Sequence, residues 1–142
     1  MLENNLNSLY REIIMEHYKT PRNKGLKSGL DIVRLKNPIC GDDVAVQVKV
    51  ENGIITEVNH EGTGCSISMS SCSIMSETVI GKTVEEARKI TENYVKMIKG
   101  EKTDSRVDLG DAIVYAGVAN FPARFKCASI AWEGLLKALN KI

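Results

Sequence analysis

The stretch Asn37-Pro38-Ile39-Cys40-Gly41-Asp42-Asp43 sets a thiol and a carboxylate two residues apart beside a glycine. Successive side chains of an extended segment alternate between its two faces, so Cys40 and Asp42 would point the same way. A soft sulfur ligand and a hard oxygen ligand would then meet one ion, and we interpret the stretch as half of a metal site. The alternative interpretation is a Pro-x-x-Gly turn with a buried free cysteine and a solvated pair of aspartates.

A strand is expected directly after this stretch, because apolar residues alternate with other residues there. The apolar residues are Val44, Val46, Val48 and Val50. Apolar residues after Gly53 predict a second strand, which would pair with the first as a hairpin. A two-residue turn would set Val48 opposite Glu57, so we predict a three-residue loop that sets Val48 opposite Thr56. A short strand is also expected over residues 30–35.

Helices are expected on both sides of these strands. Apolar residues recur at helical spacing over residues 6–18, 66–80, 84–100 and 127–142. A capping box formed by Thr83 and Glu86 predicts where the third of these helices begins. A short helix is expected over residues 109–119, and the last helix is expected to pack against the sheet.

Length and charge limit the classes of protein that fit this chain. Its 142 residues suit one domain over residues 1–142. Nineteen basic and eighteen acidic residues give a formal charge of +1, which favours neither nucleic acid nor an anionic membrane as partner. No apolar run reaches the ~20 residues of a membrane span, and residues 1–5 do not resemble a secretory signal. We therefore expect a soluble, cytoplasmic protein.

Three of the four cysteines lie where loops meet helices or strands. Cys65 opens a predicted helix, whose positive dipole end favours the thiolate, and Cys127 opens another. Cys72 lies roughly 10 Å beyond Cys65 along the helix, so we interpret it as a core residue. Together with Cys40 and Asp42, the thiols of Cys65 and Cys127 form a tetrahedral set suited to zinc or to a binuclear iron-sulfur cluster. The alternative is three unrelated buried cysteines, since no Cys-x-x-Cys pair is present.

The chain resembles the U-type iron-sulfur assembly proteins, a family that comprises IscU, SufU and the N-terminal part of NifU. The likeness extends over nearly the whole chain. It is carried by the motifs at residues 6–11, 17–23, 37–42, 64–68 and 121–128. The segment 107–111 and the ending Arg124-x-Lys126-Cys127 resemble the SufU branch in particular.

This resemblance implies an α+β fold of the SufE/NifU-like type, with a three-stranded antiparallel sheet packed against helices. It implies a zinc ion held by Cys40, Asp42, Cys65 and Cys127. It also implies a sulfurtransferase that accepts persulfide sulfur from a SufS-type cysteine desulfurase and serves downstream Suf cluster-assembly proteins. Cys40 is the expected acceptor, because a loop residue leaves a metal more easily than a helix terminus does. The alternative is a non-enzymatic scaffold that assembles a labile [2Fe–2S] cluster at the same four residues.

Two basic residues next to the last cysteine complete the expected site. Three thiolates and a carboxylate around Zn²⁺ leave a formal charge near −2, which Arg124 and Lys126 would offset. We expect Arg124 to take part in transfer by pairing with Asp42 when Cys40 leaves the metal, because a planar guanidinium suits a carboxylate. His17 and His60 match no ligand position of the family, so we interpret both as structural or surface residues.

Overall fold

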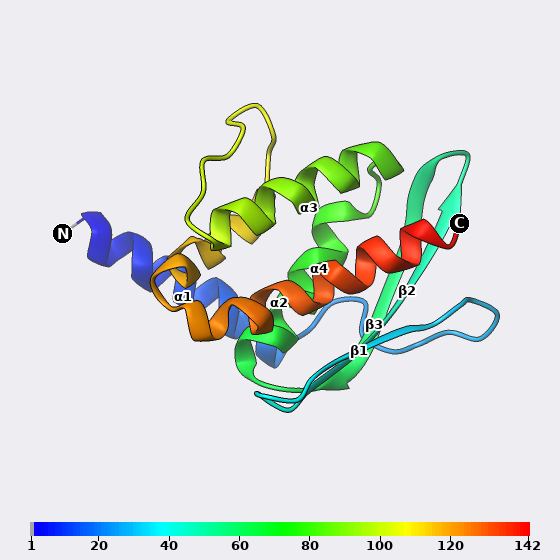
Figure 1. Ribbon diagram of the computed structural model, residues 1–142, viewed down its shortest axis with the longest axis horizontal. Helices are drawn as coiled ribbons and strands as arrows, with labels where there is room; N and C mark the ends of the chain where they lie inside the picture. Colours follow the sequence, from blue (N-terminus) through cyan, green and yellow to red (C-terminus); the bar gives the residue numbers. More distant parts are fainter. Residues whose placement is uncertain (1) are drawn as a thin grey trace.

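The computed structural model describes the backbone of residues 2–142 and the side chains from Asn7 onward. Its elements in chain order are α1 (Leu2–Lys19), β1 (Val33–Asn37), β2 (Asp42–Glu51), β3 (Ile54–Thr63), α2 (Ser66–Val79), α3 (Val84–Ile98), the 3-10 helices η1 (Gly110–Asn120) and η2 (Pro122–Arg124), and α4 (Phe125–Asn140). The expected α+β class is confirmed, since three antiparallel strands in the order β1-β2-β3 pack against helices (Figure 1). One domain over residues 1–142 stays a prediction.

The N-terminal helix is longer than its apolar pattern predicted. It runs over Leu2–Lys19 rather than from residue 6, whose side chain lies outside the described part. His17 is buried on this helix, whereas Leu9 is 50% exposed. Within residues 2–142, no helix combines the length and the apolar character that crossing a bilayer requires.

The stretch around Cys40 forms the turn of a hairpin, so its prediction as an extended segment is wrong. Asn37 and Asp42 are the last paired residues of β1 and β2, and the N–H of Gly41 donates to the Asn37 carbonyl at 2.8 Å. Gly41 has a φ of +74°, which glycine adopts without strain. Cys40 is exposed and Asp42 is buried, the reverse of the burial that the turn interpretation assigned to them.

The β2–β3 hairpin closes through a two-residue turn, so the predicted three-residue loop is wrong. Asn52 and Gly53 both have positive φ values, +54° and +78°, as a tight hairpin turn requires. A register shift next to Lys49 and Val50 then leaves Thr56 as an extra residue on β3. This bulge sets Val48 opposite Val58 rather than opposite Glu57. The strands thus keep their apolar match with the shorter turn.

The last helix packs against the sheet, as predicted, although it begins at Phe125 rather than at residue 127. A Cβ added to Gly134 of α4 would lie 2.9 Å from Val46 Cγ2 of β2, so helix and sheet approach closely there. Trp132 of the same helix is fully buried, and its ring stacks on Tyr94 with a centroid distance of 4.3 Å. Its Nε1–H donates to Ser71 Oγ at 3.1 Å, which ties α4 to α2. These contacts hold the middle of α4 against the sheet and against α2.

The helix after α2 begins as its capping box predicted. The Glu86 N–H donates to Thr83 Oγ1 at 3.0 Å, and the Thr83 N–H donates to Glu86 Oε1 at 3.2 Å. The segment over residues 109–119, expected as a short helix, forms the 3-10 helix η1. It leads through η2 into α4 and so carries the chain to Cys127.

Candidate metal centre

Three of the four predicted ligands lie together. One ligand atom from each of Cys40, Asp42 and Cys127 lies within 4.8 Å of those of the other two. Cys40 comes from the β1–β2 turn, Asp42 from the first position of β2 and Cys127 from the first turn of α4. Two sulfurs and a carboxylate oxygen form a donor set that suits zinc. The fold therefore brings together donors that are up to 87 residues apart, from position 40 to position 127.

Cys65 adjoins this group but is not one of the three residues that meet. It is the N-cap of α2, and its Sγ accepts from the Ser68 N–H at 3.5 Å. Its own backbone N–H donates to Asp42 Oδ1 at 3.1 Å. Its thiol lies near enough to Cys127 to influence the ionisation of that thiol. The fourth predicted ligand thus lies beside the other three, with its sulfur turned to the first turn of its helix.

Cys127 is the buried thiol of the group. Burial, followed by hydrogen bonding with the Cys40 and Cys65 thiols, raises the pKa of Cys127 far above its usual value. A thiol in this state stays protonated at neutral pH unless a cation stabilises the thiolate. A divalent metal ion supplies that charge, so the electrostatics of Cys127 fit a metal ligand.

Cys72 behaves differently, and its prediction as a core residue is confirmed. Its side chain is 1% exposed within the hydrophobic core. Burial, with a smaller contribution from the charge of Asp42, raises the pKa of Cys72 to about 12. Its thiol is neither exposed like that of Cys40 nor part of the three-residue group.

The Asp42 carboxylate is 1% exposed and is held by three hydrogen bonds. Oδ1 accepts from the Cys65 N–H and from Ser68 Oγ, the latter at 2.9 Å. Oδ2 accepts from Asn37 Nδ2 at 3.2 Å. A buried carboxylate requires such partners, because the loss of water is otherwise uncompensated. The three donors hold the carboxylate in place beside the Cys40 and Cys127 thiols.

Sequence reasoning did not identify Asn37, Gly64 and Ser68 as residues of the site. A Cβ on Gly64 would lie 2.4 Å from Asp42 Oδ1, so only glycine leaves room for the carboxylate. All three residues lie in motifs that support the family resemblance, and this was the available signal. The contact between Ser68 and Asp42 depends on packing between segments that are 26 residues apart in the chain, and no local sequence pattern reveals such packing.

The two basic residues near Cys127 differ in their surroundings. Lys126 Nζ donates to Glu133 Oε2 at 2.8 Å, so its charge is already paired along α4. Arg124 is exposed at the end of η2. Within the described part of the chain, its guanidinium takes part in no hydrogen bond or ion pair. The expected pairing of Arg124 with Asp42 stays a prediction.

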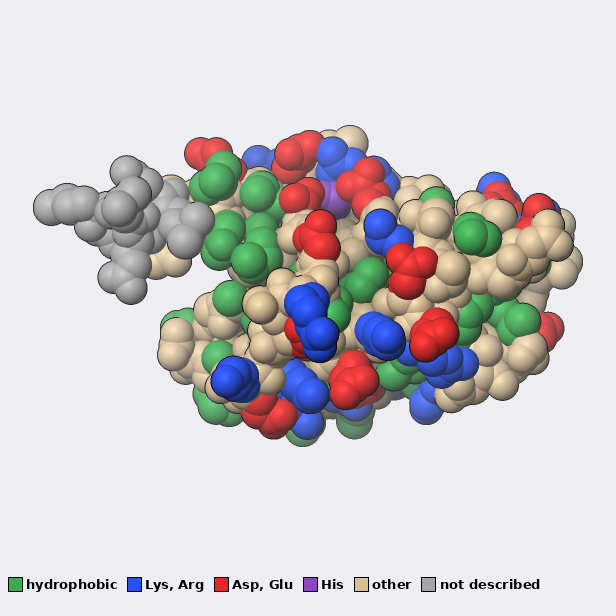
Figure 2. All heavy atoms as spheres, turned by 90° about the horizontal axis from the view of Figure 1, so that it is seen from above, with side chains coloured by type: hydrophobic (Ala, Val, Ile, Leu, Met, Phe, Trp, Pro, Cys, Tyr) green, Lys and Arg blue, Asp and Glu red, His purple; other side chains and the backbone are tan. Residues whose placement is uncertain are grey.

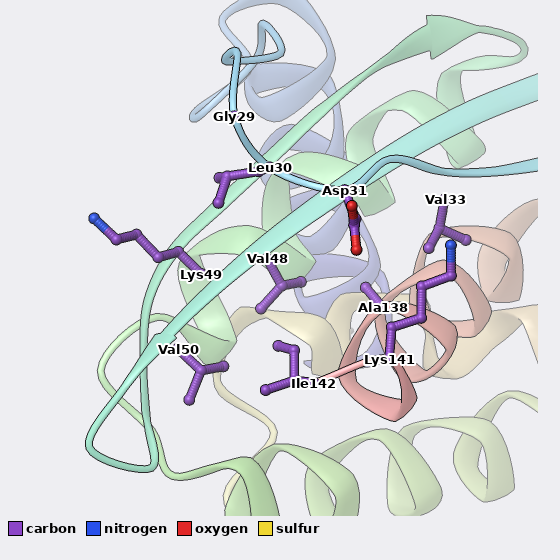
Figure 3. Close-up of a pocket in the computed structure, with 10 residues that line it drawn as sticks. All are labelled: Gly29, Leu30, Asp31, Val33, Val48, Lys49, Val50, Ala138, Lys141 and Ile142. Carbon is purple, nitrogen blue, oxygen red and sulfur yellow. The ribbon is translucent and has the colours of Figure 1, made fainter.

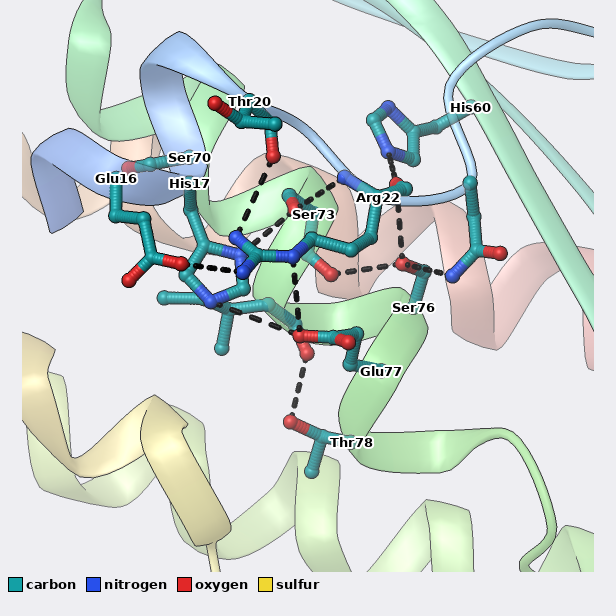
Figure 4. Close-up of polar contacts among 12 residues, drawn as sticks. Glu16, His17, Thr20, Arg22, His60, Ser70, Ser73, Ser76, Glu77 and Thr78 are labelled. Atoms are coloured by element: carbon teal, nitrogen blue, oxygen red, sulfur yellow. Dashed lines mark hydrogen bonds and ion pairs between the residues drawn. The ribbon is translucent and has the colours of Figure 1, made fainter. Parts of the chain in front are cut away.

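His17 and His60 belong to a polar network that joins α1, α2 and β3 (Figure 4). His17 Nδ1 lies 2.7 Å from Ser73 Oγ, which also accepts the Arg22 N–H at 2.8 Å. His60 Nε2 lies 2.7 Å from the Arg22 carbonyl oxygen. Both histidines are buried and have polar partners other than the predicted ligands, as the structural interpretation expects.

The protein has a surface hollow that lies away from the candidate metal centre. A hollow of about 280 Å³ lies where the C-terminal end of α4 meets β2, with Val48 and Val50 on one side and Ala138 and Ile142 on another (Figure 3). None of the predicted ligands lines it. Basic and acidic side chains are interspersed on the face that Figure 2 shows, as the balanced charge of the chain suggests.

Residues 9–128 match the profile of the family described as NifU-like N terminal domain. The chain belongs to this family, which confirms the resemblance. A zinc-dependent sulfurtransferase SufU from Bacillus subtilis is 42% identical over 137 residues, which cover 96% of this chain and 93% of that protein. An iron-sulfur cluster assembly scaffold protein IscU from Streptococcus pyogenes is 38% identical, with 96% and 86% covered.

Solved structures show the same fold. The crystal structure of SufU from Fervidobacterium islandicum superposes with a TM-score of 0.85 at 36% identity, and the match covers 90% of this chain and 94% of that one. The N-terminal part of a NifU-like protein from Brucella abortus matches with a TM-score of 0.82 at 24% identity, with 94% and 93% covered. At that lower identity the likeness concerns the fold alone.

Proposed function

We propose that this protein is a zinc-dependent sulfurtransferase that accepts persulfide sulfur from a SufS-type cysteine desulfurase. In this proposal it works in the cytoplasm and passes the sulfur to downstream Suf cluster-assembly proteins. The observation that carries the proposal is the exposure of Cys40 beside the buried donors Asp42 and Cys127. A cysteine that accepts sulfur has to be accessible to the desulfurase, whereas the residues that hold it in position can be buried. The 42% identity to a zinc-dependent sulfurtransferase supports the same function.

Cys40, Asp42, Cys65 and Cys127 are the residues that would hold the zinc ion. Cys65 would complete the set, since it already adjoins Asp42 through its backbone N–H. Zinc bound by these residues would keep their thiols ionised at neutral pH without taking part in redox chemistry. Thiolates are soft ligands, and zinc binds soft ligands well, so three thiolates suit this ion.

Sulfur transfer requires one exchange at Cys40. The Cys40 thiolate attacks the outer sulfur of the desulfurase persulfide and forms a new S–S bond. The original S–S bond breaks, and the desulfurase cysteine leaves as a thiolate. Cys40 then carries the persulfide, and the exchange consumes no external oxidant or reductant. The turn position of Cys40 allows this approach, because its side chain is exposed while Asp42 stays buried.

The second candidate function is a non-enzymatic scaffold that assembles a labile [2Fe–2S] cluster at the same residues. The 38% identity to an iron-sulfur cluster assembly scaffold protein favours it. Thiolates serve iron as well as zinc, and a carboxylate oxygen is a weak cluster ligand that eases release. The two functions differ in the metal that the protein carries in the cell.

Native mass spectrometry of protein purified without oxygen tests the proposal. We expect one zinc per chain, and one added sulfur after a cysteine desulfurase and cysteine are supplied. The added sulfur should be absent in Cys40→Ala and present in Cys72→Ala, a matched control in the core. Two irons and two sulfides without zinc would instead establish the scaffold function. Zinc without any sulfur on Cys40 would overturn the transfer role.

A further inference from the structure

Ser68 is a buried hydroxyl that contacts two of the proposed ligands. It lies in the first turn of α2 and has no exposed surface. Its backbone N–H donates to Cys65 Sγ at 3.5 Å, and its Oγ lies 2.9 Å from Asp42 Oδ1. We propose that Ser68 is a positioning residue of the metal centre, which holds the Asp42 carboxylate and the Cys65 thiol in one arrangement. This inference rests on the zinc-dependent function proposed above.

The Ser68 hydroxyl has one proton to donate and two acceptors within reach. Asp42 Oδ1 lies at 2.9 Å and the Cys65 carbonyl oxygen at 3.0 Å, whereas the Cys65 S–H donates to Ser68 Oγ at 3.6 Å. A carboxylate oxygen is a stronger acceptor than a carbonyl oxygen, and Asp42 Oδ1 is also the nearer of the two. The proton therefore goes to Asp42. The lone pairs of Ser68 Oγ stay available to the S–H of Cys65.

The hydrogen bonds of Asp42 also decide which of its oxygens can bind a cation. Each carboxylate oxygen has about two lone-pair sites. Oδ1 uses both, for the Cys65 N–H and the Ser68 hydroxyl, whereas Oδ2 uses one, for Asn37 Nδ2. A lone pair is left on Oδ2, so Ser68 makes Asp42 a ligand through one oxygen. Without this hydroxyl, Oδ1 would have a free lone pair that competes for the ion, and only two hydrogen bonds would hold the carboxylate.

Replacing Ser68 with alanine tests this role through metal binding rather than through transfer activity. We expect Ser68→Ala to bind zinc about 10- to 100-fold more weakly in competition with a chromophoric chelator, as is typical when a partner of a metal ligand is removed. The visible absorption bands of the Co²⁺-loaded protein should also shift, because the Asp42 oxygen at the metal changes. Ser68→Thr keeps the hydroxyl and should restore both readouts.

Ser70→Ala is the matched control. Ser70 is equally buried on α2, but its hydroxyl pairs with the Tyr115 hydroxyl instead of a ligand. Ser70→Ala should lose stability and keep the zinc affinity and the Co²⁺ spectrum of the unsubstituted protein. An equal loss of zinc affinity in the two alanine variants would overturn the positioning role, since destabilisation alone would then explain both.

A double-mutant cycle shows whether Ser68 acts through Asp42. In an Asp42→Asn background, Ser68→Ala should cost little further zinc affinity, because the carboxylate that it positions is already gone. If Ser68→Ala lowered zinc affinity as much in that background as in the unsubstituted protein, the proposal would be overturned. A folded Ser68→Thr with lowered zinc affinity would also overturn it, and so would a Ser68→Ala that binds zinc normally. Absence of zinc binding by the unsubstituted protein would refute the proposed function itself.

Discussion

Gly64 lies so close to the Asp42 carboxylate that a Cβ built on it would be 2.4 Å from Oδ1. The same Cβ would lie 2.5 Å from Ser68 Oγ. The backbone before α2 and the first residue of β2 therefore meet at a point where no side chain fits. Because this carboxylate is a proposed metal ligand, the need for glycine at position 64 bears directly on the proposed metal centre.

Gly64→Ala is expected to displace Asp42 and to lower zinc affinity by about tenfold or more, as the loss of ligand support usually does. Zinc bound after dialysis against a chelator series measures the effect. Gly117→Ala is the control, because a Cβ at Gly117 would meet nothing within 4 Å. Normal zinc retention by Gly64→Ala would show that Asp42 is not a required ligand.

Arg124→Ala should slow sulfur transfer more than it reduces zinc content. The Arg124 side chain is exposed and lies outside the three-residue group, so zinc should remain bound. A hydrogen bond to a charged group contributes about 1.5–3 kcal/mol, so the rate should fall on the order of tenfold or more. Single-turnover transfer and zinc content are measured on the same sample.

Lys126→Ala provides the comparison for Arg124, because Lys126 is already paired with Glu133. Loss of that exposed pair should cost about 0–1 kcal/mol and leave transfer nearly unchanged. Equal losses of rate and zinc in Arg124→Ala would count against its role in transfer.

The protein is expected to lose stability as the pH falls below about 6.5, the usual pKa of histidine. Burial is the main cause that lowers the pKa of both His17 and His60 below that value. Between the lowered pKa and 6.5 the unfolded chain binds more protons than the folded one, so the free energy of unfolding decreases there and is unaffected at higher pH. Urea unfolding of the metal-free protein between pH 5 and 8 measures this, and His17→Gln should flatten the profile. An unchanged profile in that variant would contradict the prediction for His17.

Asn52→Ala should destabilise the protein by about 1 kcal/mol, because alanine tolerates a left-handed backbone poorly. Asn52 has a φ of +54° in the β2–β3 turn. Asn52→Gly is the matched variant and should be at least as stable as the unsubstituted protein. Trp132, the single tryptophan and fully buried, reports unfolding by fluorescence. Equal stability of the two variants would argue against the two-residue turn.

Local patterns determined where the helices and strands lie. The Thr83–Glu86 capping box marked the start of α3, because both of its hydrogen bonds join residues three positions apart. Alternating valines marked β2, since side chains of a strand change face at every residue. Family motifs around the cysteines identified the candidate ligands. Each of these signals depends on neighbours in the chain, so a sequence displays it directly.

Contacts between distant segments decided the rest. The sequence predicted a loop one residue too long at Asn52, because the bulge at Thr56 depends on how β3 pairs with β2. It did not show that Cys40 is exposed while Asp42 is buried, because packing of α2 and β1 around the carboxylate sets that difference. The hydrogen bond from Ser68 to Asp42 joins residues 26 positions apart. The sequence by itself thus determined most of the elements and named the candidate donor residues, whereas the geometry of the site came from tertiary packing, which no short-range pattern records.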